Sequence, residues 1–115
     1  MNKVVLITGG ARGIGSAIAL ELAKHGYDIV INYLTSKQPA KELKEKIESQ
    51  YHVHCLTICA DVSDVNQVNI MISEVEEKMG GVDILINNAA VDLSNLFHLK
   101  NAEEFKRTLD VNVVG

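Results

Sequence analysis

The sequence predicts an α/β protein built on a doubly wound parallel sheet, with helices on both faces of the sheet. Three observations carry this prediction. Short apolar runs alternate with helical patterns along the whole chain, no Pro-rich or Ser-rich linker interrupts the alternation, and a glycine-rich turn joins the first run to the first helical pattern. Strand–helix alternation of this kind implies right-handed crossovers between parallel strands, and we expect the strand order 3-2-1-4.

Four runs have the composition of buried parallel strands. Each is short, apolar and mostly β-branched, as strands are when helices cover both faces of their sheet. The four runs are Val4–Ile7, Ile29–Ile31, Val53–Ile58 and Val82–Ile86.

Three segments between these runs repeat apolar residues at the spacing of an amphipathic helix. The third is the clearest, because its steps alternate between three and four residues, the capping box Asp64-x-x-Gln67 precedes it and Gly80-Gly81 follows it. The three stripes consist of Ile14, Ala17, Ile18 and Leu22, of Ala40, Leu43 and Ile47, and of Val65, Val68, Ile72, Val75 and Met79.

A fourth helical pattern is predicted at the end of the chain. A second capping box, Asn101-x-x-Glu104, opens it, and Phe105, Leu109 and Val113 lie on one side of the expected helix. This capping box and this spacing predict that the segment is helical, and no stop signal ends the pattern before Gly115. The strand at 82–86 is then expected to be an open edge of the sheet.

Length and composition bound the class of protein. The chain has 115 residues, 47% of them hydrophobic and 23% charged, which suits one folded domain. Its net charge of -4 argues against a nucleic-acid or anionic-membrane partner, because either would need a basic face. No apolar run has the length of a membrane span and the first residues do not resemble a signal peptide, so we expect a cytoplasmic protein. Cys55 and Cys59 are expected to be core thiols, and no metal site is expected.

The turn after the first strand carries four glycines, Gly9, Gly10, Gly13 and Gly15, in the pattern T-G-x-x-x-G-x-G from Thr8. Glycine permits positive φ and close approach of the backbone to a ligand, and a helix start offers N–H groups to an anion. After a first strand, such a turn faces a pyrophosphate in a dinucleotide-binding fold of the Rossmann type. The alternative is a tight connection without a ligand. A P-loop is excluded, because no Gly-Lys-Ser/Thr follows.

Four motifs occur in order along the chain: TGGARGIG at Thr8–Gly15, DV at Asp61–Val62, NNAA at Asn87–Ala90 and NVVG at Asn112–Gly115. With these motifs the whole chain resembles the short-chain dehydrogenase/reductases. The usual N-N-A-G ends in alanine here, which narrows the space beside the cofactor slightly. The resemblance implies a nicotinamide dinucleotide cofactor held by Gly9, Gly10, Arg12, Gly13, Ile14 and Gly15 in the turn, by Asp61 and Val62 at the adenine, by Asn88 and Ala89 at the ribose, and by Val111.

The end of the second strand bears on which nicotinamide cofactor binds. An NAD site places Asp or Glu there to accept hydrogen bonds from the ribose 2′-hydroxyl, and this sequence has Asn32 instead. Asn32 does not repel a 2′-phosphate, Arg12 can reach it, and Ser36 and Lys37 add a hydroxyl and a charge. The sequence therefore favours NADP(H), with Asn32, Tyr33 and Ser36 among its contacts, and leaves NAD open as a second cofactor.

The catalytic unit that the resemblance implies is incomplete in this sequence. Family members use a Tyr-x-x-x-Lys pair with a Ser and an Asn, and the Lys lowers the pKa of the Tyr hydroxyl. Tyr33 and Lys37 have this spacing, but they follow the second strand and precede Pro39, so we reject them. Asn112 is the candidate catalytic residue, and its alternative is a structural Asn satisfied by nearby backbone. We expect the Ser, Tyr and Lys to follow beyond Gly115.

These observations favour the cofactor-binding portion of an NADP(H)-dependent oxidoreductase that transfers hydride to or from a carbonyl or alcohol substrate. The chain resembles the 3-oxoacyl-acyl-carrier-protein reductases among this family, so the expected substrate is a small or carrier-bound carbonyl compound, and the expected state is a homo-oligomer. We expect the 115-residue chain alone to be inactive. The alternatives are an inactive nucleotide-binding or interaction module and a flavodoxin-like phosphate-binding domain, which would retain flavin.

Overall fold

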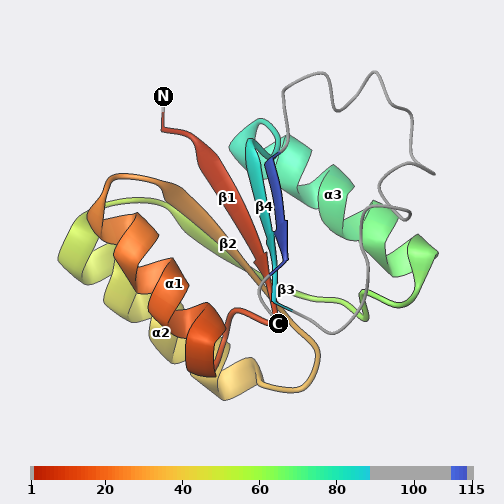
Figure 1. Ribbon diagram of the computed structural model, residues 1–115, viewed down its shortest axis with the longest axis horizontal. Helices are drawn as coiled ribbons and strands as arrows, with labels where there is room; N and C mark the ends of the chain where they lie inside the picture. Colours follow the sequence, from red (N-terminus) through yellow and green to blue (C-terminus); the bar gives the residue numbers. More distant parts are fainter. Residues whose placement is uncertain (1, 89–109, 114–115) are drawn as a thin grey trace.

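The protein is built on a parallel sheet of five strands with helices on both faces, as the computed structural model shows (Figure 1). The structure describes residues 2–88 and the backbone of 110–113. The predicted α/β class and the order 3-2-1-4 of the first four strands are confirmed, with a fifth strand added beside the fourth. The strands are β1 (Val4–Thr8), β2 (Asp28–Tyr33), β3 (Cys55–Cys59), β4 (Ile84–Asn87) and β5 (Asp110–Val113), in the order β3-β2-β1-β4-β5, and every pairing is parallel.

Three helices connect the first four strands. Helices α1 (Gly13–Lys24) and α2 (Lys37–Tyr51) cover one face of the sheet, and α3 (Val65–Met79) covers the other (Figure 1). The chain leaves β1 toward β2 and β3, then crosses back to place β4 on the other side of β1. The strand order therefore reverses between β1 and β4, and α/β sheets of this topology bind their ligands beside such a reversal, at the carboxyl edge.

The core consists of two apolar layers, one on each face of the sheet. Val4 and Leu6 of β1 pack with α3, whereas Val5 and Ile7 pack with α1 and α2. Every residue of β1 is buried, which explains why its sequence is apolar without alternation from Val4 to Ile7.

The apolar stripe predicted for α1 is partly wrong. The fully buried residues of this helix are Gly15, Ala19 and Ala23, which repeat every four positions. Ile14, placed in the buried stripe by the sequence pattern, is 61% exposed at the start of the helix. Small residues let the helix axis approach the sheet closely, so the buried face of α1 is defined by the lack of side-chain bulk rather than by hydrophobicity.

The helix predicted at the end of the chain is contradicted at Asp110–Val113, which forms β5. This strand pairs with β4, with Ile84 opposite Asp110 and Asn87 opposite Val113. The expected open edge at 82–86 is therefore wrong as well. An unpaired strand edge presents a row of backbone N–H and C=O groups, and a segment rich in β-branched valine satisfies them by pairing. The rest of the predicted helix lies outside the described residues.

The remaining expectations about the described residues are simpler. Cys55 is buried as expected, but Cys59 is exposed, so the prediction that both thiols lie in the core is wrong for Cys59. Among the residues that the structure describes, no helix is long and apolar enough to cross a membrane. The same residues contain no cluster of His, Cys, Asp and Glu side chains that could hold a metal ion.

Candidate dinucleotide site

The glycine-rich turn joins the end of β1 to the start of α1 at the carboxyl edge of the sheet. Gly9 and Gly13 adopt positive φ angles of 63° and 57°, which residues with a Cβ rarely do. A Cβ on Gly13 would have no atom within 4 Å, so this glycine faces open space. The backbone at Gly13 is therefore accessible to a ligand.

Gly15 serves packing instead of ligand access. A Cβ at this position would lie 2.6 Å from the carbonyl oxygen of Gly9 and 2.8 Å from Nδ2 of Asn88. The first turn of α1 thus rests directly on the loop that precedes it and on the residue that follows β4. A side chain at this position would force these segments apart.

The start of α1 has the features of an anion site. Arg12 occupies the N-cap position without a side-chain cap, and the first turn contains no acidic residue. The leading N–H groups of a helix lack intrahelical partners and carry the positive end of the helix dipole. A phosphate placed over this turn would accept hydrogen bonds from those groups.

Two asparagines hold the peptide groups of Gly9. The N–H of Gly9 donates to Oδ1 of Asn32 at 3.4 Å, and its carbonyl oxygen accepts from Nδ2 of Asn88 at 3.1 Å. Thr8 joins the same network, because its buried hydroxyl donates to Oδ1 of Asn87 at 2.9 Å and accepts from the N–H of Asn88 at 3.0 Å. The turn is thereby fixed to the ends of both β2 and β4.

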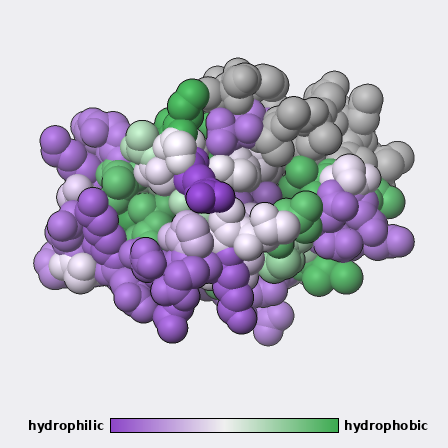
Figure 2. Space-filling model, turned by 90° about the horizontal axis from the view of Figure 1, so that it is seen from below, coloured by the Kyte–Doolittle hydropathy of each residue, from purple (hydrophilic) through white to green (hydrophobic). Residues whose placement is uncertain are grey.

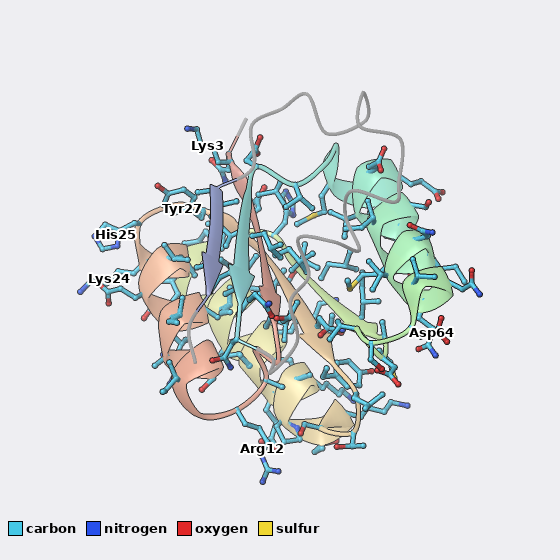
Figure 3. All side chains as sticks on the ribbon, turned by 45° about the vertical axis from the view of Figure 1, so that its right-hand side comes forward. Lys3, Arg12, Lys24, His25, Tyr27 and Asp64 are labelled. Carbon is cyan, nitrogen blue, oxygen red and sulfur yellow. The ribbon has the colours of Figure 1, made fainter. Side chains whose placement is uncertain are left out.

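A pocket of about 190 Å³ lies beside this turn, between the N-termini of α1 and α2. Ser36 is the N-cap residue of α2, as Arg12 is of α1, so the positive ends of two helix dipoles meet at one pocket. Arg12 extends away from the ribbon at this end of the molecule (Figure 3). The lining residues that the structure describes include no Asp or Glu: they are Gly9, Ala11, Arg12, Tyr33, Leu34, Thr35 and Ser36.

The view onto the carboxyl edge shows hydrophilic residues along much of its margin, with hydrophobic residues exposed between them (Figure 2). Leu34 is 56% exposed at the pocket, and Ile14 lies exposed at the start of α1. A surface that combines N–H groups, a cation and exposed apolar side chains suits a ligand that has both phosphates and flat rings.

Asp61 and Val62 follow the end of β3, and this pair is named the Asp61–Val62 shelf. The N–H of Asp61 donates to Oε1 of Gln67 at 2.8 Å, and its carboxylate accepts from the hydroxyl and the N–H of Ser63 at 2.6 and 2.9 Å. These two bonds from Ser63, the hydroxyl first, lower the pKa of Asp61 below its ordinary value. Asp61 is therefore held as a fixed carboxylate beside the buried side chain of Val62.

The capping box predicted at the start of α3 is formed in part, because Gln67 also bonds to Asp61. Asp64, at the start of the helix (Figure 3), accepts from the N–H groups of Asn66 and Gln67 at 2.9 and 3.3 Å, as a cap should. The side-chain carbonyl oxygen of Gln67 accepts from the N–H of Asp61 rather than from the N–H of Asp64, while its Nε2 donates to Oδ2 of Asp64 at 3.3 Å. The cap thus positions the shelf as well as the helix.

The structure gathers most of the predicted site residues at the carboxyl edge. Asn32 also lies at this edge, but the residue is 3% exposed and its side chain bonds to the protein framework rather than lining the pocket. Ala89 lies outside the described residues, and Val111 and Asn112 are described only as backbone in β5. Sequence analysis missed Gln67 as a site residue, and it missed the buried pair Thr8 and Asn87. Each of these two polar residues ends one of two neighbouring apolar strands, and that position is the signal that could have revealed the pair. The other predicted residues at this edge are Gly9, Gly10, Arg12, Gly13, Ile14, Gly15, Tyr33, Ser36, Asp61, Val62 and Asn88.

A larger pocket of about 530 Å³ lies at the opposite, amino-terminal edge of the sheet and is lined by Asn2, Asp28, His54, Lys78, Met79 and Gly80. The carboxylate of Asp28 is occupied there by the amide of Asn2 and the N–H of His54, at 3.2 and 2.9 Å. Because the glycine turn and the reversal of strand order beside β1 are at the other edge, we place the candidate site at the smaller pocket.

Comparison with known proteins agrees with this geometry. The family model of the short chain dehydrogenases matches residues 3–115, and the chain belongs to this family. It is 39% identical over 115 residues to the 3-oxoacyl-acyl-carrier-protein reductase FabG of Staphylococcus aureus and 40% identical to that of Staphylococcus epidermidis. All of this chain is matched in both comparisons, against 46% and 47% of the relatives, so the chain spans about half their length.

Solved structures of this family superpose on the same fold. L-sorbose reductase from Gluconobacter frateurii, complexed with NADPH and L-sorbose, has a TM-score of 0.73 and 34% identity, with 78% of this chain and 34% of that chain covered. A short chain dehydrogenase from Burkholderia cenocepacia in complex with NADP has a TM-score of 0.72 and 42% identity, covering 77% and 36%. An NADH-dependent reductase complexed with NAD has a TM-score of 0.71 and 31% identity, covering 78% and 37%.

Proposed function

We propose that this chain binds NADP(H) at the carboxyl edge of its sheet and forms the cofactor-binding portion of an oxidoreductase. The observation that carries the proposal is the pocket between α1 and α2, where Arg12 and Ser36 line the same space and the described lining residues include no carboxylate. A carboxylate there would repel a 2′-phosphate, whereas a guanidinium and two helix N-termini attract it. The related structures solved with NADPH and NADP support NADP(H) as the cofactor. The structure solved with NAD supports NAD as the alternative.

Each part of the site has a role in this proposal. The first N–H groups of α1 hold the pyrophosphate, and the open side of Gly13 lets it approach the backbone. Asp61 and Val62 lie against the adenine, and Arg12 makes a charge-assisted hydrogen bond to the 2′-phosphate. The nicotinamide, when bound, supplies or accepts a hydride. The described residues bind and orient the cofactor. Asn88 contributes by holding the glycine-rich turn through its bond to Gly9.

The substrate follows by similarity. The relatives from Staphylococcus are 3-oxoacyl-acyl-carrier-protein reductases, and we propose a small or carrier-bound carbonyl compound as the substrate. The literal Tyr-x-x-x-Lys match is rejected here too, because Tyr33 ends β2 and Lys37 begins α2, so the pair does not share a helical turn. We propose that the proton donor comes from residues other than these two, and that Asn112 supports the proton transfer. The 115-residue chain alone is then inactive. We further propose that the protein is cytoplasmic and homo-oligomeric.

The proposal is tested by titrating the protein with NADPH and NADH and following nicotinamide fluorescence. We expect NADPH to bind more tightly, by about tenfold to a hundredfold, because a charge-assisted hydrogen bond contributes about 1.5–3 kcal/mol. Arg12→Ala should remove most of this preference, and Lys24→Ala, at the far end of α1 (Figure 3), should leave it intact. Equal affinities in the unmodified protein would contradict the proposal.

A further inference from the structure

Asn32 is a buried polar residue whose side-chain amide is used on both sides. Its Nδ2 donates to the carbonyl oxygen of Ala60 at 3.0 Å, and its Oδ1 accepts from the N–H of Gly9 at 3.4 Å. Its own carbonyl oxygen accepts from the N–H of Gly10 at 3.1 Å. With 3% of its surface exposed, the residue has little contact with solvent or with a ligand in the pocket.

These bonds join two segments that the sheet alone does not connect. The last bond between β2 and β3 is donated by the N–H of Ala60 to the carbonyl oxygen of Tyr33 at 2.9 Å, so the carbonyl of Ala60 lies at the end of the ladder. Asn32 satisfies this carbonyl, and Asp61 follows directly. The same side chain reaches the first glycine of the turn. The side-chain amide of Asn32 therefore connects the glycine-rich turn to the residue that precedes the Asp61–Val62 shelf.

We propose that Asn32 is a positioning residue that fixes the glycine turn relative to the Asp61–Val62 shelf, and that its side chain does not contact the ribose 2′ position. The inference rests on the proposed function for its effect on cofactor binding. Discrimination at the 2′ position then belongs to the residues that line the pocket, Arg12, Tyr33 and Ser36. Affinity for the part common to NADPH and NADH depends on Asn32.

The chemistry requires an amide at this position. An aspartate has the shape of asparagine and can still accept from Gly9, but it places an oxygen where Nδ2 now donates to Ala60. Two oxygens would face each other in a buried place, one of them carrying charge, and the carbonyl of Ala60 would lose its partner. Asn32→Asp therefore pushes the shelf and the turn apart, whichever cofactor is bound.

Asn32→Asp separates this proposal from a direct contact with the ribose. A carboxylate that reached the 2′ position would accept from the hydroxyl of NADH and repel the phosphate of NADPH, so it would shift the preference toward NADH. A carboxylate inside the framework weakens both. We expect the dissociation constants for NADPH and NADH to rise together, by about five- to tenfold as for the loss of one hydrogen bond, with their ratio preserved within about twofold.

The test uses the full-length protein, with Asn32→Ala as a second, uncharged variant and Asn66→Ala, at an exposed position in the first turn of α3, as the matched control. Amide hydrogen exchange, followed by NMR, reports on the turn without any cofactor. We expect the N–H of Gly9 to exchange faster in both Asn32 variants, while the N–H of Gly80, which donates to Glu76 at the end of α3, is unchanged.

Two results would overturn the proposal: a shift in the NADPH-to-NADH ratio of about tenfold toward NADH in Asn32→Asp, or unchanged exchange at Gly9 in both variants. Binding of neither dinucleotide by the unmodified protein would refute the proposed function instead. In that case the exchange at Gly9 still decides whether Asn32 holds the turn.

Discussion

The side chain of Asn88 donates to the carbonyl oxygen of Gly9 at 3.1 Å, and so joins the end of β4 to the turn that follows β1. The two residues are separated by 79 positions in the sequence. Gly15 lies under this bond, because a Cβ there would meet both groups. The geometry of the glycine-rich turn is therefore set by a residue that follows another strand and by a glycine in the helix, and not by the turn alone.

Gly15→Ala should damage folding and cofactor binding together. The added methyl group would meet backbone atoms of Gly9 and Gly10 at 2.6 and 2.8 Å, which cannot move aside as a flexible side chain can. We expect the free energy of unfolding to fall by about 1–3 kcal/mol, as in other overpacked sites, in urea denaturation. Gly26→Ala is the control: its positive φ of 90° makes alanine strained, but it has open space, so stability falls while NADPH affinity does not. Equal effects of the two variants on NADPH affinity would contradict this account.

Gly13→Val should weaken cofactor binding more than Tyr33→Phe. A β-branched residue at a φ of 57° is strained, and its side chain would occupy the open side of the turn where we place the pyrophosphate. We expect the dissociation constant for NADPH to rise by about tenfold or more in Gly13→Val and by about twofold or less in Tyr33→Phe. Isothermal titration measures both. Loss of carbonyl reduction in Tyr33→Phe of the full-length protein would show that the Tyr33 hydroxyl has the catalytic role that we reject.

Ser63→Ala should raise the pKa of Asp61 toward its ordinary value of 3.8, because the hydroxyl of Ser63 is the largest cause of the lowered pKa. Since the folded pKa lies below the unfolded one, Asp61 contributes to stability above the unfolded pKa, and this contribution is lost as pH falls through the folded pKa. NMR titration of the Asp61 carboxyl carbon measures the change. Ser49→Ala, on the exposed surface of α2, should leave the titration unchanged. An unchanged pKa in Ser63→Ala would exclude this hydrogen bond as the cause.

The two cysteines should differ in reactivity. Burial, with a further contribution from the Glu48 carboxylate, raises the pKa of Cys55 to about 12, and the thiolate is the reactive form. Cys59 is exposed. At pH 8, alkylation by iodoacetamide followed by mass spectrometry should therefore modify Cys59 while Cys55 stays unmodified until the protein is unfolded. Equal labelling rates in the native protein would show that Cys55 is not shielded as described.

Much of the fold was predictable from the sequence, because both faces of the sheet are covered. Continuous apolar runs then mark the strands, and glycine and capping signals mark the helix ends. The stripe of Ala40, Leu43 and Ile47 is the buried face of α2, as predicted. The pattern failed for α1, where close packing selects Gly15 and Ala19 over the larger Ile14. It also failed at Asp110–Val113, where pairing with β4 overrides a local helical pattern.

The site was predictable in its members but not in its internal bonds. The turn pattern identified the glycines, but a linear spacing does not distinguish Gly13, which faces open space, from Gly15, which faces backbone. The end of β2 shows the same limit. Successive strand residues point to opposite faces, so a difference of one position decides whether a side chain enters the framework or the pocket. Asn32 is buried, and Tyr33 lines the pocket.

The central claim, that the pocket between α1 and α2 holds the 2′-phosphate of the cofactor, is tested most directly by an NMR titration. Adenosine 2′,5′-bisphosphate is added to the labelled protein beside adenosine 5′-monophosphate, which lacks the 2′-phosphate. We expect only the first ligand to shift the side-chain signal of Arg12 and the amide of Ser36 strongly, and neither to shift His54 at the opposite edge. Identical shifts from both ligands, or shifts centred on His54, would contradict the claim.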